Sequence, residues 1–177
     1  MKALSLAVLI IAVFGLVACG NGGDADVPVN DNTPEITDSP QQSSVFSFKM
    51  GDVPIIMDED MSVIIDKLGE PLGVLEQPSC AFEGIDRIFR YSGVEIYTYP
   101  KGDVDHIHTI SFINDSVYTT EGRIRLGANI QDAIDVYGNN YQLETGMYTF
   151  TRGQTFLRFL VNDDIIIGIT YNLQLDL

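Results

Sequence analysis

The pattern of apolar and polar positions divides the chain into three parts. Apolar residues run almost without a break from Leu4 to Phe14, and a tract of small and polar residues extends from Gly20 to about Ser44. From Val45 onward, aromatic and β-branched residues stand at alternating positions or at helical spacing. This last part carries the folded domain, and its length of roughly 130 residues is enough for one hydrophobic core.

Two segments of the domain, residues 55–69 and 124–138, align with each other without a gap. Each is predicted to contain a short helix. Asp60 and Asn129 stand at equivalent N-cap positions, where a side-chain oxygen accepts a hydrogen bond from a free helix amide. The residues that follow repeat at i, i+3, i+4 and i+7, which gives each helix one apolar face. A glycine at the last position of each segment ends the helix.

Strand-like runs follow each helix and predict antiparallel meanders. The predicted strands are 87–91, 94–99 and 106–113 in the first copy, 147–151, 154–161 and 165–172 in the second, and 116–120 between the copies. Ser92-Gly93 and Arg152-Gly153 are assigned as matching turns. The sequence therefore predicts an α+β domain of two tandem repeats, about 45–115 and 116–177. Each repeat is a short helix followed by a meander, with one sheet face open to solvent.

The helix segments resemble the repeats of the β-lactamase-inhibitory-protein-like family. The resemblance rests on Ile124 to Gly138 and, more weakly, on Ile55 to Pro71, because Asp58 stands where the second copy has Gly127. The same helix–sheet unit occurs in small lipoproteins of the outer-membrane assembly machinery. The resemblance spans about Val45 to the C-terminus and implies the tandem fold. It implies no catalytic residue, because members of the family are binding or inhibitory proteins. In the inhibitor, a concave sheet face grips another protein.

The N-terminal residues have the layout of a secretory signal that ends in a lipobox. Lys2 precedes the apolar run, and Leu16-Val17-Ala18 stand directly before Cys19. This resembles the processing site of bacterial lipoproteins, which implies cleavage before Cys19 and a diacylglyceryl group on its sulfur. We expect a signal peptide at 1–18, lipidated Cys19 with a disordered acidic tether to residue 44, and the domain at 45–177. Two acyl chains would hold it on the extracytoplasmic side of the cell membrane.

The charge of the chain limits its partners. The formal net charge of −15 repels nucleic acid phosphates and anionic lipid headgroups, so we expect no nucleic acid partner. A basic protein or bound cations remain compatible. With Cys19 lipidated, Cys80 is a lone thiol and no intramolecular disulfide is possible. No phosphate loop, HExxH, CxxC or Ser-His-Asp arrangement is present, so we predict neither an enzyme nor a cofactor.

Comparison of the two predicted meanders selects candidate contact residues. Tyr97 and Tyr99 match apolar residues of the second copy and are assigned to the core. Alternate residues point to the opposite face, which makes Ile96, Phe156 and Arg158 the candidate binding residues. The competing interpretation is that these side chains only cover a half-exposed sheet.

His106 and His108 are weak candidate metal ligands. They stand two apart on one predicted strand, with Asp103 and Asp105 close in sequence. The favoured interpretation is that the histidines occupy the end of a core stripe continued by Phe112.

These features favour a binding module, namely a membrane-anchored extracytoplasmic lipoprotein that recognises a protein, a peptide or an envelope component. A cation-binding or structural envelope lipoprotein is the alternative. A carboxylate-dependent hydrolase is less favoured, because the acidic residues fall mainly at helix caps and turns.

Overall fold

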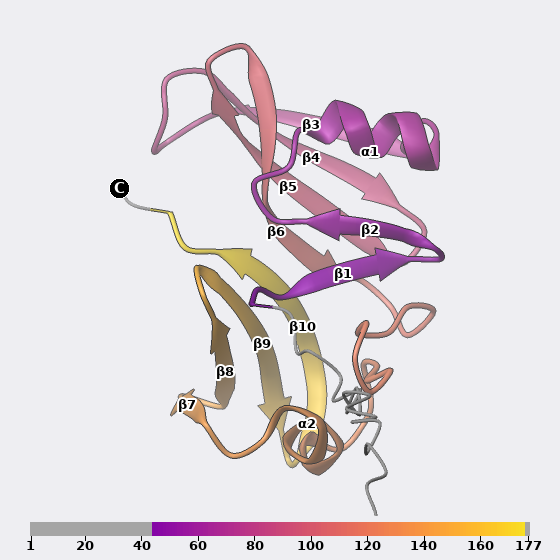
Figure 1. Ribbon diagram of the computed structural model, residues 1–177, viewed down its shortest axis with the longest axis vertical. Coiled ribbons are helices and arrows are strands. Elements are labelled where there is room, and N and C mark those ends of the chain that lie inside the picture. The colour runs from indigo at the N-terminus through magenta and orange to yellow at the C-terminus, as the bar shows by residue number, and fades with distance from the viewer. Residues whose placement is uncertain (1–43, 176–177) are drawn as a thin grey trace, which may run out of the picture. The chain divides into compact units, whose positions relative to one another are not determined.

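Ten strands and two short helices make up residues 44–175, the part of the chain that the computed structural model describes (Figure 1). The elements in chain order are β1 Ser47–Met50, β2 Val53–Ile56, α1 Met61–Leu68, β3 Gly73–Pro78, β4 Ile85–Tyr91, β5 Val94–Lys101, β6 Val104–Phe112, α2 Ile130–Tyr137, β7 Tyr141–Glu144, β8 Met147–Arg152, β9 Thr155–Asn162 and β10 Ile165–Leu173. β1 and β2 form a hairpin. The other strands form one antiparallel sheet in the order β3-β4-β5-β6-β10-β9-β8-β7.

The predicted α+β class, with tandem helix–sheet repeats, is wrong. The domain is mostly β: about half of the described residues lie in strands, whereas each helix has eight residues. The sequence pattern misses β1, β2, β3 and β7, and β3 and β7 are exposed on nearly every residue and so lack the alternation that marks a strand. It also does not show that β6 and β10 pair, which joins all eight strands into one sheet.

The predicted strands of the two meanders are confirmed as β4, β5, β6, β8, β9 and β10, with ends that differ by one or two residues. The predicted strand at 116–120 is absent. Those residues lie in the connection between β6 and α2, which has turns and no regular strand.

Both helices begin and end where the sequence predicts. The side chain of Asp60 accepts a hydrogen bond from the Ser62 amide at 2.8 Å, and Asn129 does the same for Gln131 at 2.9 Å. Each helix ends at a glycine with a positive φ, 82° in the first and 84° in the second. The N-cap and the glycine thus mark the helix limits through local contacts, and a tertiary bond from the Ile130 amide to the Asp164 carbonyl at 2.9 Å adds to the start of α2.

The segments that lead into the helices pair with the sheet in the same way. The Asp58 amide donates to the Ile107 carbonyl at 2.8 Å, and the Gly127 amide donates to the Ile166 carbonyl at 2.8 Å. Asp58 and Gly127 both have positive φ, 66° and 86°. Aspartate is one of the few residues other than glycine that tolerates this conformation, so Asp58 can replace glycine there.

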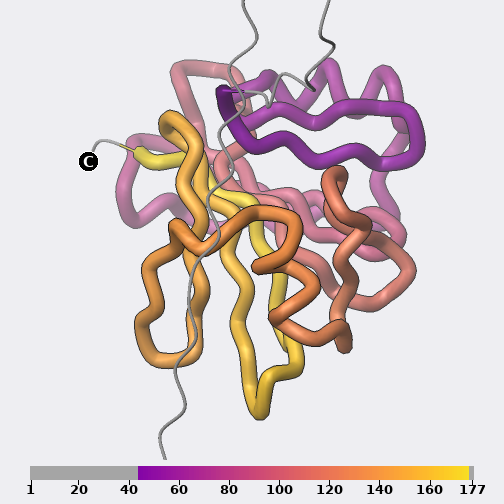
Figure 2. The backbone as a smooth tube through the Cα atoms, turned by 60° about the horizontal axis from the view of Figure 1, so that its bottom comes forward, coloured from indigo at the N-terminus to yellow at the C-terminus, as the bar shows by residue number. Residues whose placement is uncertain are grey.

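The hydrophobic core lies between one face of the sheet and a layer formed by the β1–β2 hairpin and the helices (Figures 1 and 2). Phe48 of the hairpin packs against Phe112 and Tyr171 of the sheet, with ring centroids 5.2 and 5.9 Å apart. Apolar residues with no more than 1% exposure mark this core: Phe48, Ile55, Met61, Ile64, Val94, Ile96, Ile107, Ile110, Ala133, Leu157, Phe159, Ile166, Ile169 and Tyr171. The core therefore occupies only one side of the sheet.

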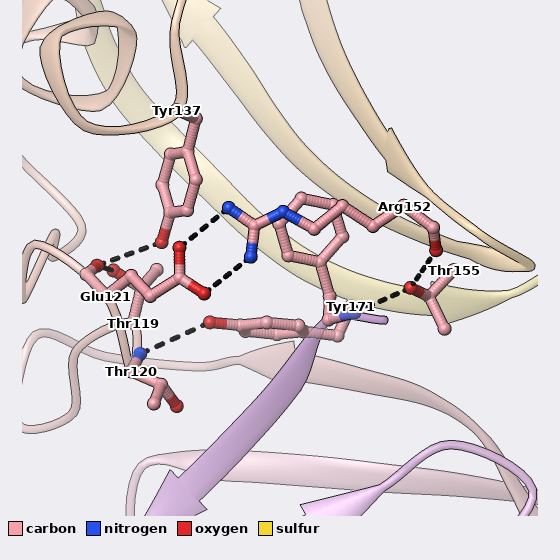
Figure 3. A network of polar contacts seen from close by, with 8 residues as sticks. Thr119, Thr120, Glu121, Tyr137, Arg152, Thr155 and Tyr171 are labelled. Carbon is pink, nitrogen blue, oxygen red and sulfur yellow. Dashed lines mark hydrogen bonds and ion pairs between the residues drawn. The ribbon is translucent and has the colours of Figure 1, made fainter. Parts of the chain in front are cut away.

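A polar network on the core side ties the connection between β6 and α2 to the sheet (Figure 3). Both terminal nitrogens of Arg152 donate to the Glu121 carboxylate, one of them at 2.7 Å. The hydroxyl of Tyr137 donates to the Glu121 carbonyl at 2.9 Å, and burial raises the pKa of Tyr137 to about 12. The Arg152 guanidinium also lies 4.3 Å from the Phe46 ring centre. These contacts hold the connection on the helix side, away from the other sheet face.

Candidate binding surface

The sheet face opposite the helices, which we call the open face, is covered by no helix or strand of residues 44–175. The strand register places Tyr97, Thr109, Asn172 and Phe156 in one row across β5, β6, β10 and β9, and Glu95, Ser111, Thr170 and Arg158 in the next. All eight side chains are half-buried, whereas the residues between them on the same strands are buried in the core. The open face thus carries aromatic, hydroxyl, amide and charged groups together.

Two of the predicted contact residues lie on the open face. Phe156 and Arg158 are neighbours on one side of β9, and the Arg158 guanidinium lies 4.9 Å from the Phe156 ring centre. An arginine stacked on an aromatic ring is a frequent energetic anchor in protein interfaces. Their role in binding stays a prediction.

The prediction that Ile96 is a contact residue is wrong. Its side chain is 0% exposed and lies in the core row with Ile110, Tyr171 and Leu157. Tyr97, which the sequence assigned to the core, lies on the open face instead.

The error comes from the position of one turn. In the first hairpin Ser92-Gly93 forms the turn, because Tyr91 pairs with Val94. In the second, Arg152 pairs with Thr155, so the turn is Gly153-Gln154 and not Arg152-Gly153. Since side chains alternate between faces, this slip of one residue puts the matched residues of β5 on the wrong side, while those of β9 keep their predicted side.

A β-bulge places both histidines on the open face. The register passes from Tyr97 opposite Thr109 to Thr98 opposite Ile107, which leaves His108 as the extra residue. The favoured interpretation of a histidine core stripe is therefore wrong, because Ile107 takes the buried position. His106 and His108 instead pack around Tyr99, with ring centroids 6.0 and 6.1 Å away.

The histidine nitrogens that have partners bind protein groups. Nδ1 of His106 lies 2.7 Å from the Asp58 carbonyl, and Nδ1 of His108 lies 3.0 Å from the Thr109 hydroxyl. Burial lowers the pKa of His108, and the Asp86 carboxylate partly opposes this. Among the described residues, no three His, Cys, Asp or Glu side chains are close enough to hold a metal ion. Asp105 instead binds Arg87 at 2.7 Å.

Asp58 connects the loop before α1 to one end of the open face. Its carboxylate accepts hydrogen bonds from the Tyr99 hydroxyl at 2.7 Å and from the Lys101 ammonium at 3.2 Å. Burial by itself opposes ionisation of Asp58, but the two donors together outweigh it and lower the pKa. Burial and the Asp58 contact raise the pKa of Tyr99 to about 12. Asp58, Tyr99 and Lys101 thus bond to one another and hold the loop before α1 against β5.

A groove of about 520 Å³ borders the open face on its β3 side. It is lined by Leu72, Gly73, Val74, Leu75, Ile88, Arg90, Glu95 and Tyr97. Arg90 and Tyr97 both donate to the Glu95 carboxylate, the latter at 2.9 Å. The bond from Arg90, more than that from Tyr97, lowers the pKa of Glu95, so the pair stays ionised and adds no net charge to the groove.

Sequence reasoning missed Tyr97 and β3 as parts of this surface. The signal for Tyr97 was the position of the turn in the second hairpin, since a turn at Gly153-Gln154 matches Tyr97 to Arg158 on the open face. The sequence fits a turn at Arg152-Gly153 as well as one at Gly153-Gln154. β3 carries no alternation that would have marked it as a strand.

The predicted lipidation site Cys19 and the tether lie outside the described residues. Cys80 lies within them and is exposed as a free thiol. No helix in residues 44–175 is long and apolar enough to cross a membrane.

The chain matches no protein-family model, and neither curated proteins nor solved structures show significant similarity to it. The predicted resemblance to the β-lactamase-inhibitory-protein-like family thus stays a prediction.

Proposed function

We propose that this chain is a binding module that recognises a protein partner through the open face. The observation that carries the proposal is the content of that face. Aromatic anchors and a stacked arginine, namely Tyr97, Phe156 and Arg158, stand around a central patch of hydroxyl and amide groups. Such a combination supplies apolar area together with directional hydrogen bonds, which is typical of protein interfaces.

The central patch is organised before any partner binds. Thr170 donates to the Asn172 side-chain oxygen at 2.9 Å, and the Asn172 amide donates to the Thr109 hydroxyl at 3.0 Å. Side chains that are already held in place lose little conformational freedom on binding, which favours affinity. The face therefore combines fixed polar groups in the middle with aromatic groups on both sides.

The predicted lipid on Cys19 would place this face outside the cytoplasm and close to the membrane. A diacyl anchor gives stable membrane attachment, whereas a single acyl chain does not. We propose on this basis that the partner is a protein of the cell envelope. The test of the anchor is metabolic labelling with a fatty acid. Label and membrane association should both be lost in Cys19→Ser, and a labelled Cys19→Ser chain would contradict the assignment.

The open face is tested by photo-crosslinking of the full chain in the cells that produce it. The crosslinker p-benzoylphenylalanine is placed at Thr151 or Phe156 on the open face, and at Gln131 on the exposed side of α2 as a control. Adducts of one defined mass are expected from the first two positions only. Equal adducts from Gln131, or none from the open face, would contradict the proposal.

A second variant tests the arginine anchor. Arg158→Ala should reduce the yield of the adduct formed at Thr151, because loss of an interface arginine typically weakens binding about tenfold or more. Arg123→Ala is the matched control, since Arg123 also stacks on an aromatic ring, Tyr118, but lies in the connection before α2. Equal reductions in both variants would indicate a general effect of charge.

A further inference from the structure

β3 forms one edge of the sheet and exposes all six of its residues. The most exposed large apolar side chains of the described chain gather here, with Leu72 76% and Leu75 60% exposed. The outer side of an edge strand presents backbone groups that can pair with another strand. Proteins that avoid such pairing usually protect the edge with charged residues, yet β3 carries a single charge, Glu76.

A groove runs along each side of β3, and Val74 lines both. The groove on the open face is apolar, with Leu72, Leu75, Ile88 and Tyr97 in its wall. The groove on the helix side has a volume of about 550 Å³ and is lined by residues of both α1 and β3. Its polar wall contains Asp60, Glu76, Asp103, Asp105 and Arg87, above an apolar floor formed by Met61, Ile65 and Phe89.

The two grooves differ in charge. On the helix side four carboxylates face one guanidinium, which binds Glu76 and Asp105 at 2.7 Å each. Asp103 is exposed and lines this groove, whereas Asp105 is paired with Arg87. The charged residues that line the open-face groove, Arg90 and Glu95, pair with each other. A ligand that fills both grooves therefore needs cationic groups on one side and apolar groups on the other.

A strand paired with β3 meets this requirement, because its successive side chains point to opposite faces of the sheet. We propose that β3 binds an extended peptide as a ninth strand, with apolar side chains in the open-face groove and lysine or arginine side chains in the acidic groove. The peptide thus alternates apolar and basic residues. This site shares Tyr97 with the open face but is separate from the anchors Phe156 and Arg158, which lie on β9 in the other half of the sheet.

A second copy of the chain fits the edge less well. Each copy carries a formal charge of −15, and pairing of two β3 strands would bring two acidic grooves together. Charge complementarity thus favours a basic peptide, and self-association becomes an outcome of the test.

The test uses the purified full chain and a fluorescein-labelled peptide with a six-residue segment of alternating valine and lysine, matching the length of β3. Fluorescence anisotropy should show saturable binding that weakens with added salt. A peptide of the same composition in blocks, three valines and then three lysines, should bind much more weakly. So should an alternating valine–glutamate peptide. Binding of either comparison peptide with the affinity of the alternating valine–lysine peptide would overturn the proposal.

Variants locate the peptide on the sheet. Leu75→Thr should weaken binding about tenfold, since it removes an apolar wall of the groove but keeps a strand-forming residue. Asp103→Asn should weaken it about threefold and reduce the salt dependence. Leu143→Thr, which alters an apolar residue 53% exposed on the opposite edge strand β7, is the matched control and should have no effect. Equal weakening by Leu143→Thr would overturn the proposal.

Amide hydrogen exchange supplies a readout that does not depend on variants. Bound peptide should slow exchange in β3 but not in β7. Phe156→Ala should leave the peptide affinity unchanged, so a loss there would place the peptide on the open face and overturn the edge site. An absence of peptide binding, together with a dimer that Leu75→Thr dissociates, would assign the edge to a second copy. These outcomes are independent of the open-face crosslinks, so the two proposals can fail separately.

Discussion

Replacing Ile96 by alanine tests which face of β5 belongs to the core. The change removes three buried carbon atoms, worth about 0.8 kcal/mol each in transfer free energy. Ile96 is 0% exposed and is surrounded in its row by Phe89, Ile110 and Tyr171, so the neighbours cannot close the space completely. Adding a cavity contribution of about 1 kcal/mol, we expect the free energy of unfolding to fall by roughly 3 kcal/mol.

The matched control is Tyr97→Ala, one residue further along the strand. Tyr97 is half-buried on the open face, and its hydroxyl donates to the Glu95 carboxylate. We expect a loss of about 1 kcal/mol, in keeping with an exposed sheet position.

Urea unfolding followed by circular dichroism measures both variants against the unmodified chain, with the slope of the transition as a check that unfolding remains cooperative. The decisive quantity is the order of the two losses. If Tyr97→Ala costs more than Ile96→Ala, the register of β5 described above is wrong. The open face would then have to be redrawn.

Three further predictions concern the connection, the Asp58 cluster and the free thiol. Gly122→Ala should destabilise the domain by about 2–4 kcal/mol in thermal unfolding, because φ is +68° and the new Cβ would lie 2.4 Å from a Val136 methyl. Gly127→Ala is the control: the space around Gly127 is open, so this change should cost only about 1 kcal/mol. Equal costs for the two variants would contradict the predicted clash. The pKa of Asp58 is lowered in the folded chain, so its ionised form stabilises the fold above about pH 4 and that contribution disappears as the pH falls further. Asp58→Asn should therefore lose less stability than the unmodified chain between about pH 5 and pH 3 in urea titrations, and an identical pH profile would refute this. Cys80 is exposed, so a maleimide should label it in the native state at the rate seen in urea, and strong protection would show that the thiol is covered.

Much of the local structure could be predicted because it depends on neighbouring residues. Asp60 and Asn129 cap helices through bonds to amides two residues away, and the central strands show their alternation directly in the sequence. The edge strands could not be predicted in this way. β3 and β7 have no buried face of their own, and they are strands only because β4 and β8 pair with them.

The candidate surface was predicted in part. Phe156 and Arg158 alternate with the apolar residues Leu157 and Phe159, and the structure places both on the open face. Ile96 was misplaced because the matching of two hairpins depended on one turn that the sequence leaves ambiguous. The histidines were misplaced because a β-bulge at His108 reverses the alternation, and a bulge is a property of the paired strands.

The sequence by itself determined the helix limits, the six central strands and the acidic character of the chain, because each of these depends on neighbouring residues or on composition. Only the tertiary structure decided that the two meanders join through β6 and β10 into one sheet, that the helices and the β1–β2 hairpin cover one face of it, and that β3 lies at its edge between an apolar and an acidic groove. The physical reason is that strand pairing links residues far apart in the chain. Alternation along a strand shows that two faces exist, whereas the register of its partners decides which face is buried.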